Sequence, residues 1–176
     1  MKKLILSVLA IIMVASFSNQ VVAQGDATGS ATATATIVTP LAIASTVQMN
    51  FGILAVNATV GTVVLTPAGG TTATGGVTLP PTNPGTITAA SFDVTGEGAY
   101  TYAITLPSTD YTITNTTGVG AETMVVNTFT STPSGTGVLT AGAQTIVVGA
   151  TLNVGSSQVA GVYTNATGFD VTVDYN

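Results

Sequence analysis

Alternation of side chains with a period of two is the feature that most restricts what this chain can fold into. After residue 23, short segments alternate apolar and polar side chains, and no convincing helical period of 3.6 is present. Threonine and valine dominate these segments, and all 35 threonines follow residue 23. Both side chains are β-branched and favour strands, so the sequence predicts an all-β fold.

The clearest alternation is at the C-terminus of the sequence. Its apolar positions are Phe169, Val171, Val173 and Tyr175, and an Asp, Thr or Asn follows each of them. This pattern predicts a strand with one apolar, buried face and one wet face. Residues 100–106 and 41–51 alternate in the same way and predict two more strands.

Seven further strands are predicted between turns rich in Gly and Pro. They cover residues 61–66, 76–79, 87–95, 110–115, 122–130, 144–154 and 159–165. About ten short strands at this spacing are typical of an antiparallel sandwich. We therefore predict an immunoglobulin-like β-sandwich over residues 40–176, preceded by a strand-forming extension over residues 24–39.

Two other all-β architectures fit the sequence less well. An outer-membrane barrel would have longer alternating segments and aromatic girdles, whereas the Phe and Tyr residues here are few and scattered. A Thr-rich β-solenoid, such as an ice-binding protein, would show a fixed repeat period. Thr32, Thr34 and Thr36 have suitable spacing but belong to no such repeat.

The first 23 residues have the pattern of a secretory signal peptide. Lys2 and Lys3 precede an apolar run over residues 4–14, and a polar stretch leads to Ala23. The run ends before reaching the roughly 20 apolar residues of a membrane-spanning helix. We expect cleavage after Ala23 and export through the periplasm to the cell surface or medium, with no membrane insertion afterwards.

Charge excludes two classes of partner. The chain has 2 Lys+Arg and 7 Asp+Glu, and both cations, Lys2 and Lys3, lie in the predicted signal peptide. The mature side-chain charge is therefore −7. A chain without Lys or Arg cannot neutralise phosphates, so nucleic acid and anionic membrane surfaces are not expected partners.

The sequence predicts neither an enzyme nor a cofactor or metal site. His and Cys are absent, which removes the usual general base, the thiol nucleophile and the ligands of zinc and copper. Asp93 and Glu97 could form an acid–base pair of the glycosidase type. They lack the aromatic and cationic neighbours that such pairs have, and Glu97 lies at a predicted hairpin tip. A calcium site built from separate loops stays open.

Three triplets match the acceptor sequence for N-glycosylation. They begin at Asn57, Asn115 and Asn165. Such triplets arise by chance in a chain rich in Asn and Thr, so they are a weak indication.

The extension has two interpretations. Residues 31–38 alternate like a strand, but with small side chains that add little to a core. One interpretation is an ordinary first edge strand of the domain. The other is a donor strand that pairs with a sheet edge of the next subunit. The residues that would make this subunit contact are Ala31, Ala33, Ala35 and Ile37.

Three segments resemble a known family. They are Asn50-Phe51-Gly52, the Gly96-Glu97-Gly98-Ala99-Tyr100-Thr101-Tyr102 segment, and the final segment, residues 168–176. With the signal peptide and the Ala/Thr-rich strand, they resemble secreted bacterial proteins catalogued as a domain of unknown function. Genes of that family often lie near fimbrial chaperone and usher genes. The resemblance implies a subunit of a surface fibre.

The penultimate Tyr175 also resembles the C-terminal signature of chaperone–usher pilins. It implies that Phe169, Val171, Val173 and Tyr175 pair with a periplasmic chaperone, and that an outer-membrane usher is a further partner. Together these expectations describe a structural subunit that forms a homopolymer by strand donation. The alternative is an adhesin or carbohydrate-binding module. Sugar binding usually uses an exposed aromatic platform, for which Tyr100, Tyr102, Tyr111 and Tyr163 are the candidates here.

Overall fold

The computed structural model describes residues 25–118 and 120–176. The predicted signal peptide and its cleavage site lie outside the described residues. Residues 37–176 form one compact unit, and residues 25–36 belong to a separate part of the chain. Within residues 25–118 and 120–176, no helix is long and apolar enough to span a membrane.

The compact unit is built from strands joined by turns. The strands are β1 (Ala42–Val47), β2 (Asn50–Phe51), β3 (Ala55–Leu65), β4 (Thr71–Thr78), β5 (Ile87–Thr88), β6 (Ala90–Thr95), β7 (Thr101–Thr105), β8 (Tyr111–Asn115), β9 (Thr123–Thr132), β10 (Thr136–Val138), β11 (Ala143–Val154), β12 (Tyr163–Thr164) and β13 (Thr172–Tyr175). All pairings between these strands are antiparallel. The predicted all-β, antiparallel sandwich is confirmed.

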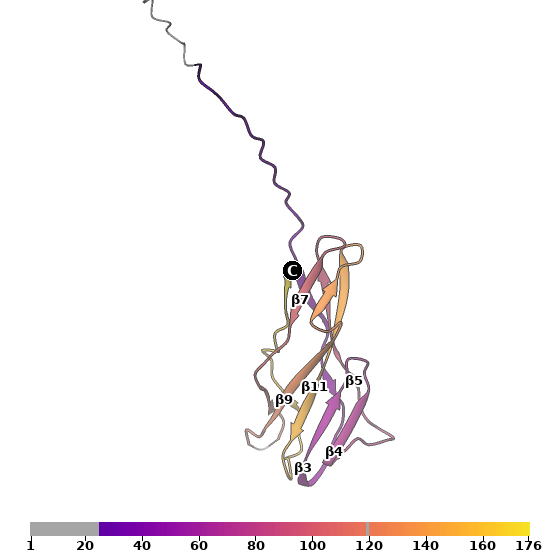
Figure 1. Cartoon of the computed structure of the whole chain (residues 1–176). Helices are drawn as coiled ribbons and strands as arrows, with labels where there is room; N and C mark the ends of the chain where they lie inside the picture. The colour runs from indigo at the N-terminus through magenta and orange to yellow at the C-terminus, as the bar shows by residue number, and fades with distance from the viewer. Residues whose placement is uncertain (1–24, 119) are drawn as a thin grey trace, which may run out of the picture. The chain divides into compact units, whose positions relative to one another are not determined.

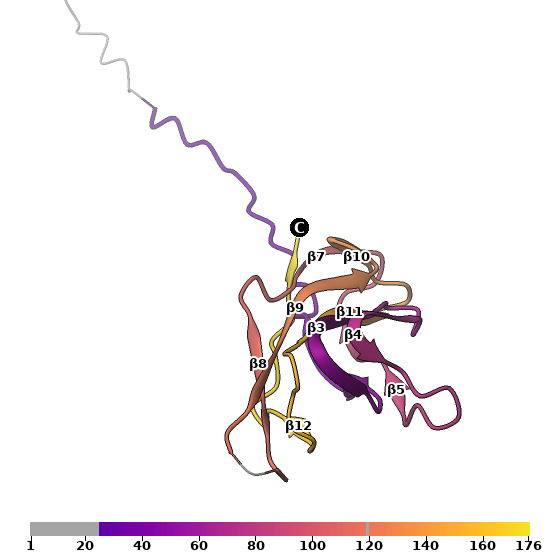
Figure 2. The same cartoon turned by 90° about the horizontal axis from the view of Figure 1, so that it is seen from below.

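Strand β11 organises the larger sheet. One of its edges pairs with β9, while the other pairs with β6 over its first half and with β3 over its second half. Strands β1, β4, β8 and β12 extend this sheet outward. A smaller sheet has the order β10-β7-β13, and β2 pairs with β5. Figure 1 shows β11 between β9 and β3, and Figure 2 shows β8 and β12 together, away from β4 and β5.

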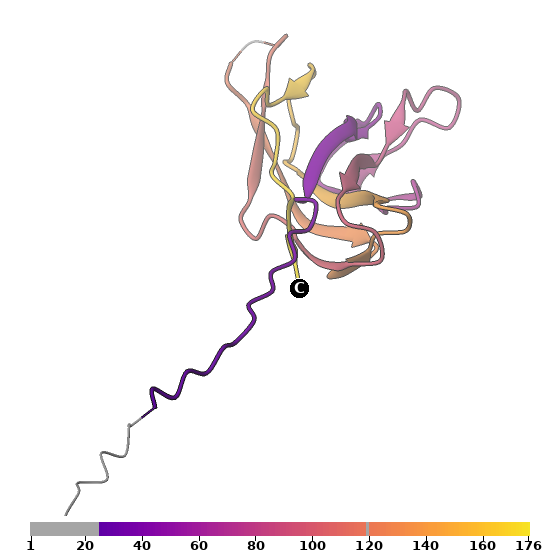
Figure 3. The same ribbon diagram turned by 90° about the horizontal axis from the view of Figure 1, so that it is seen from above.

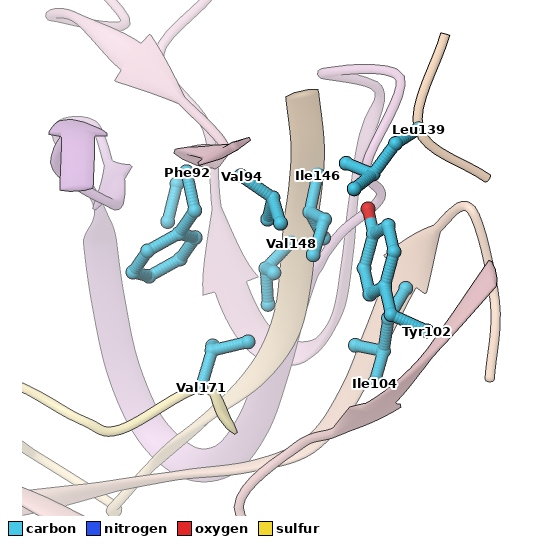
Figure 4. Packing of buried hydrophobic residues seen from close by; sticks show 9 residues of the cluster. Phe92, Val94, Tyr102, Ile104, Leu139, Ile146, Val148 and Val171 are labelled. Atoms are coloured by element: carbon cyan, nitrogen blue, oxygen red, sulfur yellow. The ribbon is translucent and has the colours of Figure 1, made fainter. Parts of the chain in front are cut away.

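The first core joins the larger sheet to the sheet β10-β7-β13. Alternate residues of β6 and β11 face Tyr102 and Ile104 of β7 (Figure 4). Leu139 and Val171, from segments flanking β10 and β13, complete the set. Each fully buried apolar side chain contributes about 1.5–3 kcal/mol to folding. The Tyr102 hydroxyl donates to the Gln144 side-chain oxygen at 2.8 Å, so its one polar atom is satisfied.

The second core lies at the other end of β11. Its buried members are Val63, Val77, Met124, Val126, Ala150, Leu152 and Val154. They come from β3, β4, β9 and β11, whose alternating residues face the same side. Figure 3 shows the same unit from above, with β3 in purple. With no cysteine in the chain, the fold is held by these two cores and by backbone hydrogen bonds.

Several predicted strand limits were wrong. The segment 41–51 divides into β1 and β2, and the segment 159–165 contains only β12. Strand β10 was not predicted. Residues 96–98 do not form a hairpin tip, because β6 and β7, on either side, belong to different sheets. They form a crossover between the two sheets.

Candidate functional site

Strands β1 and β13 each have one unpaired edge within the described part of the chain. β1 pairs with β6, and β13 pairs with β7. Both lie at the end of their sheet, β1 in the larger sheet and β13 in the smaller one. An unpaired edge presents free N–H and C=O groups to which another strand can add. β4, β10 and β12 also end their sheets. Among these end strands, only β13, with Val173 and Tyr175, and β1, with Ile43 and the preceding Leu41, place half-buried apolar side chains against the first core.

These two edges border an incompletely covered part of the first core. Leu41 and Ile43 pack against it at β1, and Val173 and Tyr175 pack against it at β13. All four side chains are half-buried, in contrast to the fully enclosed Val94 in the centre. Of the six residues of β1, five are exposed. Another apolar strand at these edges would therefore remove additional apolar surface from water.

The predicted donor residues are exposed and belong to no strand. Ala31, Ala33 and Ala35 lie in residues 25–36, where no secondary structure is formed. Ile37 is 96% exposed, the highest exposure among the large apolar side chains described. The extension was predicted to form a strand, and within this single chain it does not. An ordinary first edge strand of the domain, the plainer interpretation, is therefore not what residues 31–38 form here.

The start of the compact unit is held by a cluster of three residues, Thr39, Glu97 and Tyr175, which we call the clamp. The Tyr175 hydroxyl donates to the Thr39 carbonyl oxygen at 2.7 Å and accepts the Glu97 backbone N–H at 2.6 Å. The Thr39 backbone N–H and hydroxyl both donate to the Glu97 carboxylate, each at 3.1 Å. The clamp thus joins the segment before β1, the β6–β7 crossover and the end of β13.

The clamp also depends on a glycine. A Cβ on Gly96 would overlap the Tyr175 hydroxyl and press on Leu139 and Leu41. The Tyr175 ring packs edge-on against Tyr100, with the ring centroids 5.6 Å apart. Two hydrogen bonds from Thr39 hold the pKa of the Glu97 carboxyl below its usual range, and the bond from the backbone N–H has a larger effect than the bond from the hydroxyl. Glu97 therefore has a structural role as an anion that accepts hydrogen bonds.

The four predicted chaperone-contact residues share one face but differ in burial. Val171 is buried in the first core, while Val173 and Tyr175 are half-buried beside it. Phe169 is also half-buried, and its ring packs against Phe92, Tyr111 and Phe129. The alternation predicted for residues 169–176 is confirmed. Val173 and Tyr175 belong to β13 itself, whereas Phe169 and Val171 precede it, so the half-buried residues on the strand with the unpaired edge are Val173 and Tyr175.

The tyrosines form no exposed aromatic platform in the described structure. Tyr102 is fully buried, and Tyr111 and Tyr163 are half-buried with their hydroxyls bonded to backbone carbonyls. Tyr100 is 44% exposed and is the ring that packs against Tyr175. Of the four tyrosines, only Tyr102 is a fully buried core residue. The aromatic site expected of a sugar-binding module is nevertheless not assembled from them.

The carboxylates do not gather into a reactive or metal-binding group. Asp93 accepts a hydrogen bond from the Thr145 hydroxyl at 2.8 Å, and Glu97 is engaged by Thr39. The two members of the predicted acid–base pair therefore have different partners on different elements. Across residues 25–118 and 120–176, no group of three or more acidic side chains is placed to hold a metal ion.

The three sequon asparagines all use their side chains within the fold. In each, the side-chain oxygen accepts the backbone N–H two residues later, at Thr59, Thr117 and Thr167. Asn115 is also buried and accepts a second N–H from Gly118 at 2.7 Å. A glycan on Asn115 would require this loop to open. Its amide is a structural element of the loop.

The contacts that Thr39 and Glu97 make in the clamp were not predicted. Thr39 and Glu97 lie 58 positions apart, and Thr39 and Tyr175 lie 136 apart, so no local pattern links them. The available signals were the Tyr175 position near the end of the sequence and Glu97 between two glycines. Neither signal identifies its partner.

Comparison with known proteins identifies a family without assigning an activity. Residues 41–175 match the model described as Domain of unknown function (DUF4402). The chain belongs to the DUF4402 family. The predicted membership of a domain-of-unknown-function family is thus confirmed at this level, and the match begins just after the clamp residue Thr39. No curated protein and no solved structure matches the chain.

Proposed function

We propose that this DUF4402 protein is a secreted structural subunit of a bacterial surface fibre or extracellular matrix, and that copies join by β-strand donation. The observation that carries the proposal is the pair of unpaired edges, β1 and β13, beside one incompletely covered core. An added strand would gain backbone hydrogen bonds along an edge and cover the half-buried side chains there.

The proposed donor is residues 31–38 of another copy. This segment alternates Ala with Thr and ends in Ile37 and Val38, so that one face is apolar throughout. Small side chains suit a core that is already largely filled, because Ala adds apolar contact without requiring a deep cavity. Thr side chains on the other face favour strand geometry and stay wet.

The clamp favours donation to another copy over folding back. Thr39 is bonded through its N–H, its hydroxyl and its carbonyl oxygen, and Pro40 follows it. A residue before proline prefers an extended conformation. A segment that returned along β1 of its own domain would need a tight turn at this point, and the clamp opposes that turn.

The β13 edge would need protection before assembly. Unpaired edges promote aggregation, so a subunit of this kind needs that edge covered until it joins the fibre. A periplasmic chaperone that pairs with β13 near Val173 and Tyr175 would supply that cover, and an usher would then exchange it for the donor. The seven carboxylates and many hydroxyls keep the assembled surface soluble.

Deletion of residues 31–36 tests the proposal. The deletion keeps the cleavage region, Ile37 and the whole clamp, so the domain should retain its fold by circular dichroism. Electron microscopy of cells that express the variant should show no fibres, whereas deletion of residues 25–30, which leaves the donor in place, should leave fibres intact. Regular fibres built from the variant without residues 31–36 would refute strand donation by this segment.

A further inference from the structure

A shallow, largely open cavity of about 530 Å³ lies at the end of the larger sheet, far along β11 from the residues that face the first core. Its lining crosses four strands in one row: Thr74 of β4, Thr62 of β3, Asn153 of β11 and Val125 of β9. Thr62, Val125 and Asn153 alternate with the buried Val63, Val126 and Leu152. Their side chains therefore point to the sheet face opposite the second core.

The polar side chains of the cavity are held in fixed orientations. The Asn153 amide nitrogen donates to the Val125 carbonyl oxygen at 3.2 Å and to the Asn127 side-chain oxygen at 3.0 Å. Both amide protons are used, and the Asn153 side-chain oxygen remains an acceptor for a ligand. On the wall, the hydroxyl oxygens of Thr62 and Thr74 lie 2.7 Å apart. One of these hydroxyls donates its proton to the other, so the accepting hydroxyl keeps its own proton to donate to a ligand.

Gln158 fixes the opposite wall. Its amide nitrogen donates to the Thr123 carbonyl oxygen at 3.2 Å and to the Tyr163 hydroxyl at 3.0 Å. Its side-chain oxygen accepts the Gly155 backbone N–H at 3.1 Å. Three hydrogen bonds hold this side chain against the cavity. The walls are therefore organised before any ligand enters, which lowers the entropic cost of binding.

The lining is neutral throughout. The lining residues are Thr, Asn, Gln, Gly, Val and Met, and none of these carries a charge; Met124 and Val154 among them turn their side chains into the second core. Val60, which is 63% exposed, supplies an apolar contact beside the hydroxyls. The volume falls within the range of about 300–1,000 Å³ that is usual for small-molecule sites. A neutral ligand that carries both hydroxyls and C–H faces matches these groups.

We propose that this cavity binds a neutral saccharide. The Asn153 side-chain oxygen accepts a hydrogen bond from a sugar hydroxyl, and the Thr62–Thr74 pair donates one to a ring or hydroxyl oxygen. Val60 contacts a C–H face of the sugar. An anionic sugar would find no cation here, and a positively charged ligand would find no carboxylate in the lining. The site is separate from the edges of β1 and β13, so the inference stands independently of the proposed function.

A glycan array that carries neutral, sialylated and sulfated glycans tests the inference with the full chain. Neutral glycans should be retained, and their affinity should then be measured by titration calorimetry. Asn153→Ala and Thr62→Val should each weaken binding about tenfold or more, because each removes a ligand-facing polar group. Thr145→Val, on β11 but outside the cavity, is the matched control and should bind as the unaltered chain does.

Three outcomes would overturn the inference. One is the absence of binding to every neutral glycan on the array, and another is binding confined to sulfated or sialylated glycans. The third is binding that both Asn153→Ala and Thr62→Val leave unchanged. Thr62→Val keeps the branched shape of the side chain and removes its hydroxyl, so its result stays interpretable if Asn153→Ala fails to fold.

Discussion

The hydroxyl oxygen of Tyr175 lies 2.7 Å from the carbonyl oxygen of Thr39, across 136 positions of sequence. The same hydroxyl accepts the Glu97 N–H. One phenol group thus joins the C-terminal strand, a crossover between the sheets and the start of the compact unit. The strand proposed to accept a partner and the point where the donor segment leaves the domain are therefore mechanically connected.

Removal of the Tyr175 hydroxyl should destabilise the domain. Tyr175→Phe keeps the ring against Tyr100 but removes the acceptor of the Glu97 N–H and the donor to Thr39. The loss should be about 1–2 kcal/mol in the free energy of unfolding, measured by urea denaturation. Tyr100→Phe, the other ring of this pair, should cost less than about 0.5 kcal/mol. Equal effects of the two variants would show that the clamp adds no stability.

A methyl group at Gly96 should open the clamp by pushing the Tyr175 hydroxyl away. Gly96→Ala places a Cβ against the Tyr175 hydroxyl, and the rigid core residues Leu139 and Leu41 limit any adjustment. We expect a loss of about 1–3 kcal/mol in the same unfolding measurement. Gly98→Ala is the control, because its Cβ would meet only the Gly142 nitrogen at an ordinary 3.6 Å. A neutral Gly96→Ala would mean that Tyr175 is free to move.

The clamp should weaken in acid. The folded-state pKa of Glu97 is lowered by donation from Thr39, so Glu97 contributes stability above its unfolded pKa of about 4.3. This contribution is lost as the pH falls through the lower, folded-state pKa. Urea denaturation of the unaltered chain and of Glu97→Gln should therefore differ at pH 6, and the difference should shrink toward pH 3. A difference that stays constant over this range would contradict an anionic role for Glu97.

Export should depend on the Tyr175 ring more than on its hydroxyl. A chaperone that pairs with β13 would contact the half-buried ring, so Tyr175→Ala should lower surface levels several-fold, while Tyr175→Phe should be exported at near-normal levels. Immunoblots of surface and periplasmic fractions make this comparison. Asp174→Ala, on the wet face of the same strand, is the control. Normal surface levels of Tyr175→Ala would count against chaperone recognition.

The strands that alternation predicted well are those with one face in a core. In β13, Val173 and Tyr175 face inward and Asp174 faces solvent, and Val171 just before the strand is buried, as the pattern indicates. Strand β10 escaped prediction because three residues in a Gly-rich turn region carry no period. Its position is set by pairing with β7, a tertiary contact. The predicted hairpin at Glu97 failed for the same reason, since turn residues do not specify which sheet the next strand joins.

The candidate site was predictable only in its separate parts. The alternation of residues 31–38 and the apolar face of the last strand are visible in the sequence. Which edges remain unpaired depends on the order of strands in each sheet, which sequence patterns do not encode locally. The proposed saccharide cavity could not be predicted from local sequence patterns, because Thr62, Thr74 and Asn153 become neighbours only through strand register.

Strand donation can be tested directly because the chain contains no cysteine. Copies that carry Thr32→Cys, Thr34→Cys or Thr36→Cys are mixed with copies that carry Asp174→Cys on the exposed face of β13, and are then oxidised. Adjacent strands bring paired Cα atoms to about 4.4–6.8 Å, the distance a disulfide needs. The account predicts mixed disulfide dimers with Asp174→Cys, at one or two of the three donor positions, and few with Thr72→Cys on the distant edge strand β4. No dimers with Asp174→Cys at any donor position, or as many with Thr72→Cys, would contradict donation of residues 31–38 to β13.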